Sequence, residues 1–518
     1  MKRDERLITT LLNMTSNDIV STEPQQLLSS QRQQRSNDDG KELHIAPMLD
    51  VSYREFRYFM RLLTKRAVLW TEMVVDDTIQ YCNNIDEHLG YDTEVEHPVI
   101  CQLGGNHPDL MYDAVRIVAQ EYGYDEINLN CECPSVRVAG RREFGAALMI
   151  NVDCAVQVVE SMHRAAQSVA AVPISVKVRI AVDDFDSLDY LMDFIGRLQP
   201  YCQRFILHAR KVLMKGLSPA QNRRVPPLNY PRVYAICHAF PDCQFWINGG
   251  IHSLKDAKRI CYGIDSCREI VSHAEHENED QPAWKNDNDY DCTKKNPHCV
   301  PCVVCKAPFG SCIAPPAVAP PNLMGCMMGR AAMDHPCLFW DVDRYFYGEA
   351  HNPVGTRRNL LERYCAYLER IYPRRCCDRD ERKTNRFPTS PEDTVFERYR
   401  DFCRICQHVY DPTVSAKDGK VSETESLPTL AEGDTDDDSL KPREEVKITF
   451  HIVHRSIKPT LGVFFNVPGQ KSFRRQIDRL TRDIVFRNCG PGFILRTAMK
   501  CMPDQVLDES FVRTEEFA

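Results

Sequence analysis

The chain has 518 residues, more than one hydrophobic core usually fills, so the sequence predicts two domains with insertions. No stretch reaches the roughly eighteen apolar residues of a membrane-spanning helix, so we expect neither a membrane protein nor a membrane partner. The 24 cysteines accompany no apolar leader of signal-peptide length, which favours free thiols in a reducing compartment over a disulfide framework.

The net charge of −8 is unevenly distributed along the chain. Residues 411–446 hold eleven acids against four bases, and residues 275–291 hold seven acids against one base, together −13. The rest of the chain therefore carries about +5. Its bases are concentrated in residues 447–500, with eleven Lys or Arg against two acids, so a polyanionic partner remains compatible with the composition.

Eight short β-like runs lie between Leu43 and Arg330, and most are separated by stretches with helical periodicity. This alternation predicts an α/β fold with a parallel sheet, and eight units favour a (β/α)8 TIM barrel over residues 41–347. An open doubly wound sheet is the alternative. The predicted strands are His44–Met48, Val68–Met73, Pro98–Leu103, Glu126–Asn130, Pro173–Arg179, Arg204–His208, Gln244–Asn248 and Leu323–Gly329.

Helical periodicity is clear in Asp109–Glu121, Asp153–Val169 and Ser253–Cys261. After the last of these the next predicted strand begins only at Leu323. An acidic, Cys-rich insertion of about residues 265–322 therefore interrupts the barrel. Because it connects a helix to a strand, we expect it on the barrel face opposite the active site.

Beyond Arg330 the pattern turns helical, and residues 348–518 are predicted to form a smaller all-helical domain. Its first candidate helices are Arg357–Tyr372 and Pro391–Val409. A low-complexity acidic linker over about residues 412–445 interrupts this domain. Residues 1–40 are expected to be a disordered tail.

The segment Asn128–Ser135 carries the strongest chemical signal. It reads as a strand that ends in a cysteine loop, with Cys133 directly before Pro134. Barrels place reacting groups just past the carboxyl ends of their strands. Cys133 is therefore the candidate acid, and Cys131, two residues earlier, is interpreted as a packing residue.

The insertion contains a second group of thiols. Five cysteines fall within 21 residues, with Cys-x2-Cys-x2-Cys spacing at Cys299, Cys302 and Cys305, followed by Cys312. Such spacing can hold zinc or an iron–sulfur cluster, but a disordered Pro/Cys-rich loop without metal is the preferred interpretation. No metal site is therefore assigned.

The motifs together resemble the A-type tRNA-dihydrouridine synthases, and the order and spacing of the motifs match as well. The resemblance covers about Leu43–Tyr347 apart from the insertion, and returns over about Ile448–Asp483. The barrel motifs are Ala46-Pro47-Met48-Leu49-Asp50, Thr71-Glu72-Met73, Gln102-Leu103-Gly104-Gly105, Asn128 through Ser135, Lys177-Val178-Arg179, His208-Ala209-Arg210-Lys211 and Asn248-Gly249-Gly250. The features that point to the A subgroup are Gly216-Leu217-Ser218-Pro219, Pro226-Pro227-Leu228 and Tyr230-Pro231-Arg232.

The resemblance implies reduction of the C5=C6 bond of D-loop uridines in tRNA, with FMN as cofactor and NADPH as electron donor. Hydride from the reduced flavin attacks C6, and Cys133 on the other side of the base supplies the proton to C5. The partner is then tRNA, with no obligatory protein partner evident. The expected location is the cytoplasm, with the mitochondrion as the alternative.

The resemblance also assigns the flavin site. Asn248-Gly249-Gly250 and Gly329-Arg330 would hold the phosphate through backbone N–H groups and a cation. The residues assigned to the isoalloxazine or its tail are Pro47, Met48, Leu49, Gln102, Lys177 and His208.

For tRNA, the resemblance assigns Asn130 to the target uracil and Arg223 to a nucleic-acid contact, and we include Arg179 and Arg210 in the substrate set. The helix after Gly469 is the clearest binding element. At 100° per residue its bases lie on one face and its apolar residues on the other. The basic face is Lys471, Arg474, Arg475, Arg479 and Arg482, and the apolar face is Phe473, Ile477, Leu480 and Ile484.

One departure from the family concerns the residue before the candidate acid, which is usually glycine and here is Glu132. A carboxylate beside a thiol should raise the pKa of the thiol, and loss of glycine would restrict the loop. Arg141-Arg142-Glu143 also stands in a loop where small residues are common. These departures leave open a catalytically impaired tRNA-binding paralogue. A separate alternative is an FMN barrel that reduces a small pyrimidine or enone.

Overall fold

The computed structural model describes residues 40–134, 143–169, 171–263, 318–372, 449–483, 486–487 and 489–511. The chain divides into two compact units. The first comprises Met1–Ser52, Arg66–Gly329 and Val342–Ala350, and the second comprises Tyr53–Lys65, Arg330–Asp341 and His351–Ala518. The predicted tail, the Cys-rich insertion up to residue 317, the helix Pro391–Val409 and the acidic linker lie outside the described residues.

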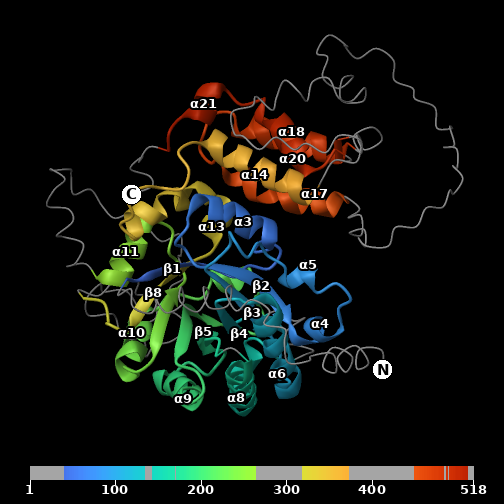
Figure 1. Ribbon diagram of the computed structural model, residues 1–518. Coiled ribbons are helices and arrows are strands. Elements are labelled where there is room, and N and C mark those ends of the chain that lie inside the picture. Colours follow the sequence, from blue (N-terminus) through green and yellow to red (C-terminus); the bar gives the residue numbers. More distant parts are fainter. Residues whose placement is uncertain are drawn as a thin grey trace, which may run out of the picture. The chain divides into compact units, whose positions relative to one another are not determined.

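The first unit is a barrel of eight parallel strands in the part of the chain that the structure describes (Figure 1). The sheet order is β1-β8-β7-β6-β5-β4-β3-β2, and backbone hydrogen bonds between β1 and Val68, the residue before β2, close it, with Ile45 N donating to Val68 O at 2.9 Å. This confirms the predicted (β/α)8 fold. The strands are β1 Glu42–Ile45, β2 Leu69–Val75, β3 Val99–Gly104, β4 Glu126–Cys131, β5 Ile174–Val182, β6 Arg204–Val212, β7 Gln244–Asn248 and β8 Leu323–Met328.

Three strands end at least three residues away from the predicted position. β1 ends at Ile45 rather than Met48, because Pro47 has no N–H to donate to a sheet. β5 and β6 continue past Arg179 and His208 to Val182 and Val212. Arg179 and His208, at which the prediction ended these strands, are polar side chains buried inside the barrel, and each has a hydrogen-bond partner there.

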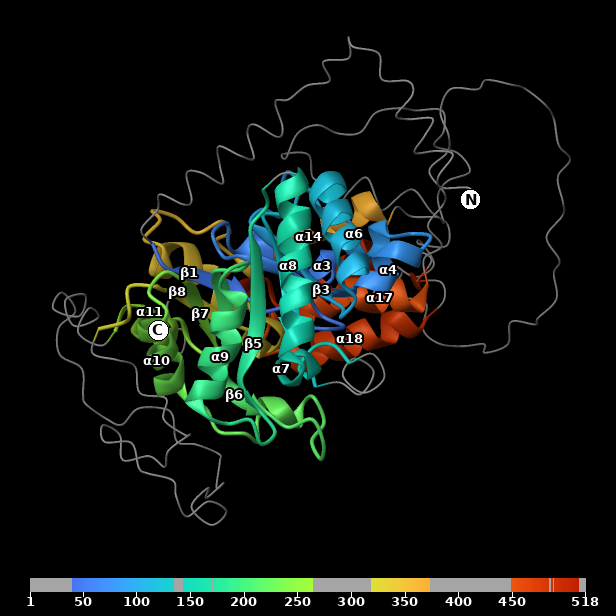
Figure 2. The same ribbon diagram turned by 90° about the horizontal axis from the view of Figure 1, so that it is seen from below.

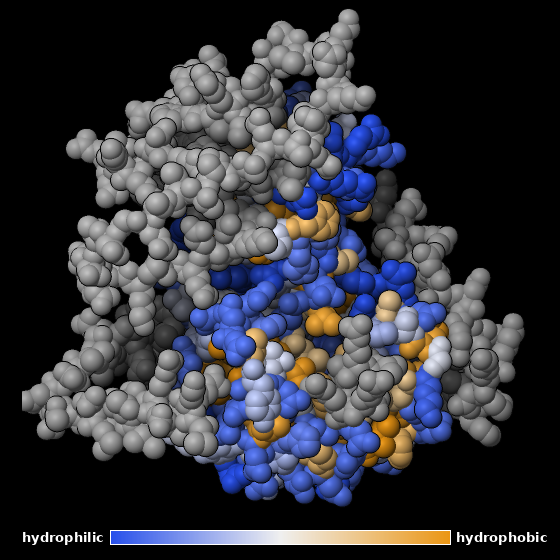
Figure 3. Space-filling view, turned by 90° about the vertical axis from the view of Figure 1, so that its right-hand side faces the viewer, coloured by the Kyte–Doolittle hydropathy of each residue, from blue (hydrophilic) through white to orange (hydrophobic). Residues whose placement is uncertain are grey.

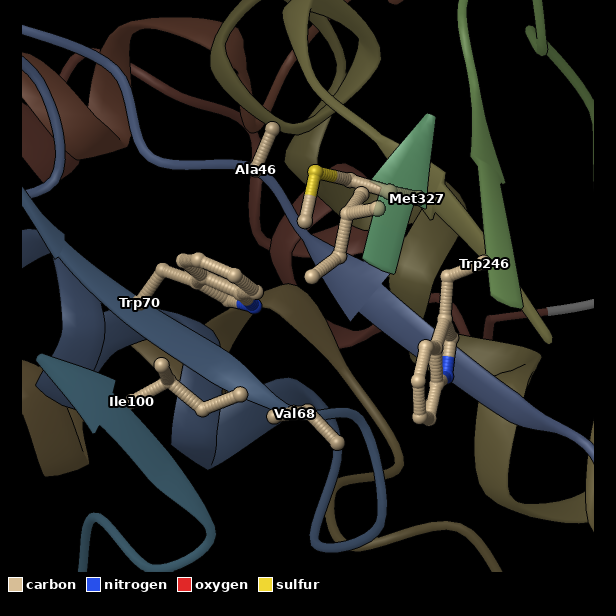
Figure 4. Close-up of a cluster of buried hydrophobic side chains, with 7 residues drawn as sticks. Ala46, Val68, Trp70, Ile100, Trp246 and Met327 are labelled. Atoms are coloured by element: carbon tan, nitrogen blue, oxygen red, sulfur yellow. The ribbon is translucent and has the colours of Figure 1, made fainter. Parts of the chain in front are cut away.

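A cluster of buried side chains fills part of the barrel interior. Figure 4 shows the two indoles among smaller apolar side chains, of which the labelled ones come from strands β3 and β8 and from residues next to β1 and β2. His44 lies between the indoles, with ring centroids 5.8 Å from Trp70 and 5.5 Å from Trp246. The cluster consists of Ala46, Val68, Trp70, Ile100, Ile206, Trp246 and Met327.

The ring nitrogens of these aromatic side chains are paired. Trp70 Nε1 donates to His44 Nδ1 at 3.2 Å, so His44 Nε2 carries the hydrogen that bonds Glu42 Oε2 at 3.0 Å. Trp246 Nε1 donates to the same carboxylate oxygen at 3.0 Å. The network therefore joins β1, β2 and β7, and each buried ring nitrogen has a partner.

Helices surround the barrel strands, as Figures 1 and 2 show. α8 runs beside α6, and Ser161 Oγ of α8 donates to Pro108 O at 2.7 Å (Figure 2). The predicted helix from Asp109 is present, but it changes to a π-helical turn at Val118–Tyr122 and ends at Gly123, whose φ is +66°. The α-helices of this unit are α4 Asp76–Tyr81, α5 Asp86–Leu89, α6 Pro108–Ile117, α7 Ala147–Ile150, α8 Val152–Val169, α9 Leu188–Leu198, α10 Tyr230–Ala239 and α11 Leu254–Tyr262.

The second unit is helical. Helices α14 and α20 approach closely at Gly492, where a Cβ atom would lie 3.0 Å from the carbonyl oxygen of Cys365. The Arg496 guanidinium binds both carboxylate oxygens of Glu369, at 2.8 and 3.2 Å. The α-helices are α3 Arg54–Leu63, α13 Arg330–Asp334, α14 Arg357–Ile371, α17 Phe450–Ile457, α18 Gln470–Arg482, α20 Pro491–Met499 and α21 Asp504–Asp508.

Figure 3 shows hydrophobic residues interspersed among hydrophilic ones on the face that it presents. Among the described residues, no helix is both long and apolar enough to cross a bilayer.

Glu42 should make the stability of the barrel depend on pH. Burial alone would raise its pKa, but hydrogen bonding and charge interaction with His44, together with Arg204 and Trp246, lower the pKa from 4.5 to about 2. The carboxylate then stabilises the folded state above about pH 4.5 and loses that effect as the pH falls toward 2. The melting temperature of the wild type should therefore fall as the pH decreases through this range, and Glu42→Gln should make that fall shallower. Parallel profiles for variant and wild type would contradict this.

Candidate active site

The turn that carries Cys133 follows β4, at the carboxyl end of the strand. Asn130 Oδ1 accepts hydrogen bonds from the backbone N–H of Glu132 at 3.2 Å and of Cys133 at 3.0 Å. On the other side, Ala146 N donates to Cys133 O at 3.1 Å. Cys133 is half-buried, whereas Cys131 is fully buried and burial raises the pKa of its thiol. The turn therefore holds one accessible thiol at the rim of the barrel.

A chain of side-chain amides fixes the residue that forms this turn. Asn130 Nδ2 donates to Gln102 Oε1 at 3.0 Å, and Gln102 Nε2 donates to Asn128 Oδ1 at 2.9 Å. Asn128 Nδ2 then donates to Ser175 Oγ at 2.8 Å. The chain links β3, β4 and β5. The sequence did not lead us to predict Asn128 and Ser175 as members of this hydrogen-bonded chain. The spacing of two between Asn128 and Asn130 does place both side chains on one face of β4.

Glu132 lies at the centre of a cluster of cationic and ring nitrogen atoms. Its Oε1 forms an ion pair with Lys177 Nζ, and its Oε2 lies 3.2 Å from His208 Nδ1. Arg179 Nε is 3.9 Å from the same oxygen, too far for a hydrogen bond. The exposed side-chain fractions are 1% for Lys177 and 16% for Glu132, so the pair is largely out of solvent.

The cluster fixes the charge of each member. Burial alone would raise the pKa of Glu132, but Lys177, His208 and Arg179 outweigh it and hold the pKa well below its usual range. Burial, then the charge of Arg179, lowers the pKa of His208 to about 3. The imidazole is therefore neutral near pH 7, and its Nδ1 donates to the ionised carboxylate. One carboxylate thus faces two buried cations, Lys177 and Arg179.

Two arginines assigned to the substrate are buried in the barrel. Arg179 Nη1 donates to Asn222 O at 3.1 Å, and Arg210 Nη1 donates to Arg224 O at 3.3 Å and also to the carbonyl of Pro226. Both side chains therefore hold the loop that follows β6. Arg223 lies on this loop and is exposed.

Glycines form the rim at the end of β7. Gly249 has φ of +112° and Gly250 has φ of +74°, which residues with side chains rarely adopt. A Cβ atom on Gly249 would lie 2.9 Å from His208 Cδ2, so glycine also leaves space next to the imidazole. Asn248, at the end of the strand, lies 3.4 Å from Lys177 Nζ through its Oδ1.

The remaining residues of the predicted cofactor set occupy the neighbouring strand ends. Pro47 and Met48 are half-buried and Leu49 is 67% exposed, in the turn after β1. Gln102 is buried within the amide chain. Gly329 follows β8 in the barrel unit, while Arg330 begins α13 of the helical unit.

Helix α18 of the second unit has the amphipathic form that the sequence predicts. Phe473, Ile477 and Leu480 are buried, and Ile484 lies outside the described residues. The opposite face is exposed and basic, with one base paired to an acid, Arg482 to Asp478 at 3.1 Å. The exposed bases are Lys471, Arg474, Arg475, Arg479 and Arg482.

Comparison with known proteins identifies the family. A family model described as dihydrouridine synthase (Dus) matches residues 44–278. The tRNA-dihydrouridine(20/20a) synthase of Vibrio cholerae serotype O1 is 35% identical over 330 residues, which cover 63% of this chain and 80% of that protein. The chain belongs to the dihydrouridine synthase family.

Other Dus relatives match a shorter stretch at higher identity. The tRNA-dihydrouridine(20/20a) synthase of Escherichia coli O6:H1 is 46% identical over 223 residues, 43% of this chain and 65% of that protein. The Salmonella typhi synthase is 47% identical over 223 residues, 43% of this chain and 64% of that protein. The chain therefore aligns with just under two thirds of the length of these two relatives.

The rim of this Dus barrel fits an anionic flavin. Arg179 Nε is a buried donor without a hydrogen-bond partner among the described residues, and Lys177 and Arg179 leave one positive charge in excess of Glu132. The positive-φ glycines after β7 open a cradle that a side chain would fill. Glu132 is the one member whose charge opposes an anionic ligand.

The Cys-rich insertion carries the remaining site prediction. Cys299, Cys302, Cys305 and Cys312 lie outside the described residues. Elsewhere, the described residues contain no group of three or more His, Cys, Asp or Glu side chains arranged to hold a metal ion. The sequence assigns no metal to the insertion, and a metal site there stays an alternative to a loop without metal.

Proposed function

We propose that this Dus-family protein reduces the C5=C6 bond of D-loop uridines in tRNA to dihydrouridine, with FMN as cofactor and NADPH as electron donor. The observation that carries the proposal is the position of Cys133. It is an accessible thiol on the turn after β4, beside a carboxylate that contacts Lys177 and His208 of the neighbouring strands. The names of the relatives, tRNA-dihydrouridine(20/20a) synthases, support tRNA as the substrate.

FMN, when bound, would supply the hydride that adds to C6 of the uracil. The residues that would hold it are Asn248, Gly249, Gly250 and Gly329 with Arg330 near the phosphate. Pro47, Met48, Leu49, Gln102, Lys177 and His208 would line the rest. The geometry of the rim supports this assignment. Three of these side chains, on β3, β5 and β6, are buried, and the glycines leave space between them.

Cys133 would complete the reduction by giving its proton to C5. The S–H bond breaks as the C5–H bond forms, and the thiol becomes a thiolate. Lys177 and Arg179 interact electrostatically with the ionised form of Cys133, so their positive charges stabilise the thiolate that proton transfer leaves behind. Solvent then returns a proton to the thiolate for the next cycle.

Asn130 would act on the substrate side by holding the turn in place. Its carbonyl oxygen already accepts two backbone N–H groups, including that of Cys133, and its amide is fixed by Gln102. Arg179 and Arg210 would support the loop that presents Arg223 to the RNA. These roles explain why polar side chains are buried beneath an RNA-binding surface.

The exposed bases of α18 would bind the tRNA backbone. A uridine stacked in folded tRNA must be swung out to reach the barrel rim, and contacts elsewhere on the RNA offset that cost. Lys471, Arg474 and Arg475 would supply such contacts, since their helix buries its other face. A reductase of free pyrimidines has no use for this surface, which disfavours that alternative.

Replacing the candidate acid gives the first test. With purified protein, tRNA, FMN and NADPH, Cys133→Ala should slow dihydrouridine formation about 10²- to 10⁴-fold, the usual contribution of a general acid. NADPH oxidation by the flavin should stay within about twofold of wild type. The control is Cys154→Ala, a half-buried thiol whose Sγ donates to Asn106 O, which should retain activity. Full activity of Cys133→Ala would refute the assignment.

A charge reversal on α18 tests the RNA surface. Lys471→Glu with Arg474→Glu should weaken tRNA binding and make the binding less dependent on salt, because fewer counterions are released. Flavin reduction by NADPH should be nearly unchanged. The matched control is Arg116→Glu with Lys255→Glu, an equal charge change at exposed positions on α6 and α11. If both double variants bind tRNA equally well, α18 is not the binding element.

A further inference from the structure

Glu132 is the feature of the rim that the proposed reaction does not use. It stands directly before Cys133, at a position where the family resemblance implies glycine. The side chain does not point into solvent: it is 16% exposed and contacts nitrogen atoms on two neighbouring strands. Its carboxylate therefore fills space inside the rim and adds a negative charge there, whereas a glycine would do neither.

The partners of Glu132 are residues assigned to the cofactor. Lys177 of β5 pairs with Oε1 and His208 of β6 bonds Oε2, and both are assigned to the flavin in the proposed function. Lys177 Nζ has Asn248 Oδ1 at 3.4 Å as a further neighbour. An anionic or carbonyl-rich ligand at this rim must therefore compete with a carboxylate that is already in place.

The carboxylate also compensates buried charge. Lys177 and Arg179 have side chains 1% and 3% exposed, and burial lowers the pKa of both. Repulsion lowers each pKa further, from Arg179 in the case of Lys177 and from Arg223 in the case of Arg179. Glu132 opposes this for both residues. A buried charge left without its partner is costly, so the folded protein without a ligand depends on this pair.

We propose that Glu132 is an internal substitute for the cofactor anion: it holds Lys177 and His208 in the flavin-free protein and must release them when FMN binds. This inference rests on the proposed function. Glu132 would then set the affinity of this chain for FMN. A glycine at this position would not compete with FMN. The protein should consequently bind FMN weakly for a Dus barrel and stay folded without it.

The test is an FMN titration of the full-length chain, stripped of flavin and followed by quenching of FMN fluorescence. Glu132→Gln and Glu132→Gly should each bind FMN about tenfold more tightly than wild type, because the competing charge is gone. The same variants, without FMN, should melt at a lower temperature than wild type, and FMN should raise their melting temperature by more than it raises that of wild type. Neither readout requires catalytic turnover.

Glu126→Gln is the matched control. Glu126 begins β4, at the opposite end of the strand that precedes Glu132, and pairs with Arg204 Nε at 2.7 Å. Its loss should lower the melting temperature and leave the FMN dissociation constant within about twofold of wild type.

The outcomes separate the two ideas. Equal or weaker FMN binding by both Glu132 variants, with normal binding by wild type, would overturn the role of Glu132 and leave the proposed function intact. Absence of FMN binding in wild type and in every variant would overturn the proposed function and this inference together. FMN binding by the Glu132 variants but not by wild type would support the inference most strongly.

Discussion

The closed register of parallel strands is the constraint on which the site depends. Lateral pairing aligns Asn130 with Lys177, Arg179 with His208, and His208 with Asn248 across β4 to β7. Residues far apart in the chain therefore meet at one rim, because parallel strands in a barrel all end on the same face. A residue in the turn after one of these strands therefore lies near the ends of the other strands. In the turn after β4, these residues are Cys133 and Glu132.

Burial gives these polar residues their properties. In a low-dielectric interior an unpaired charge or amide is expensive, so each must find partners among the neighbouring strands. The result is an amide chain on the side of β3, β4 and β5 and an ion cluster on the side of β5 and β6. The first fixes the thiol in place, and the second determines the charge that a ligand or substrate meets.

Much of this architecture is readable from the sequence. Eight apolar runs predict the eight strands, and the spacing of Phe473, Ile477 and Leu480 predicts which face of α18 is buried. Both predictions rest on a periodic pattern within a single segment of the chain. The strand ends predicted at Arg179 and His208 were wrong, because a polar side chain can lie inside the barrel when it has a partner there. That partner comes from another strand, so pairing of this kind leaves no local signal.

Glu132 illustrates the same limit at the site. As a sequence neighbour of Cys133, it is expected to act on the thiol, whereas the structure directs its carboxylate to Lys177 and His208. Only the register shows that those residues lie within reach. The residues proposed to bind RNA in the helical unit are easier to predict, because an exposed basic face depends on one helix and not on several strands.

The central claim is that this chain makes dihydrouridine in tRNA. The most direct measurement is site-resolved mapping of dihydrouridine in tRNA from cells that have the protein and cells that lack it. The account predicts that particular D-loop positions lose the modification when the protein is absent and regain it when the wild-type chain is restored. An identical dihydrouridine map in both kinds of cell would contradict it.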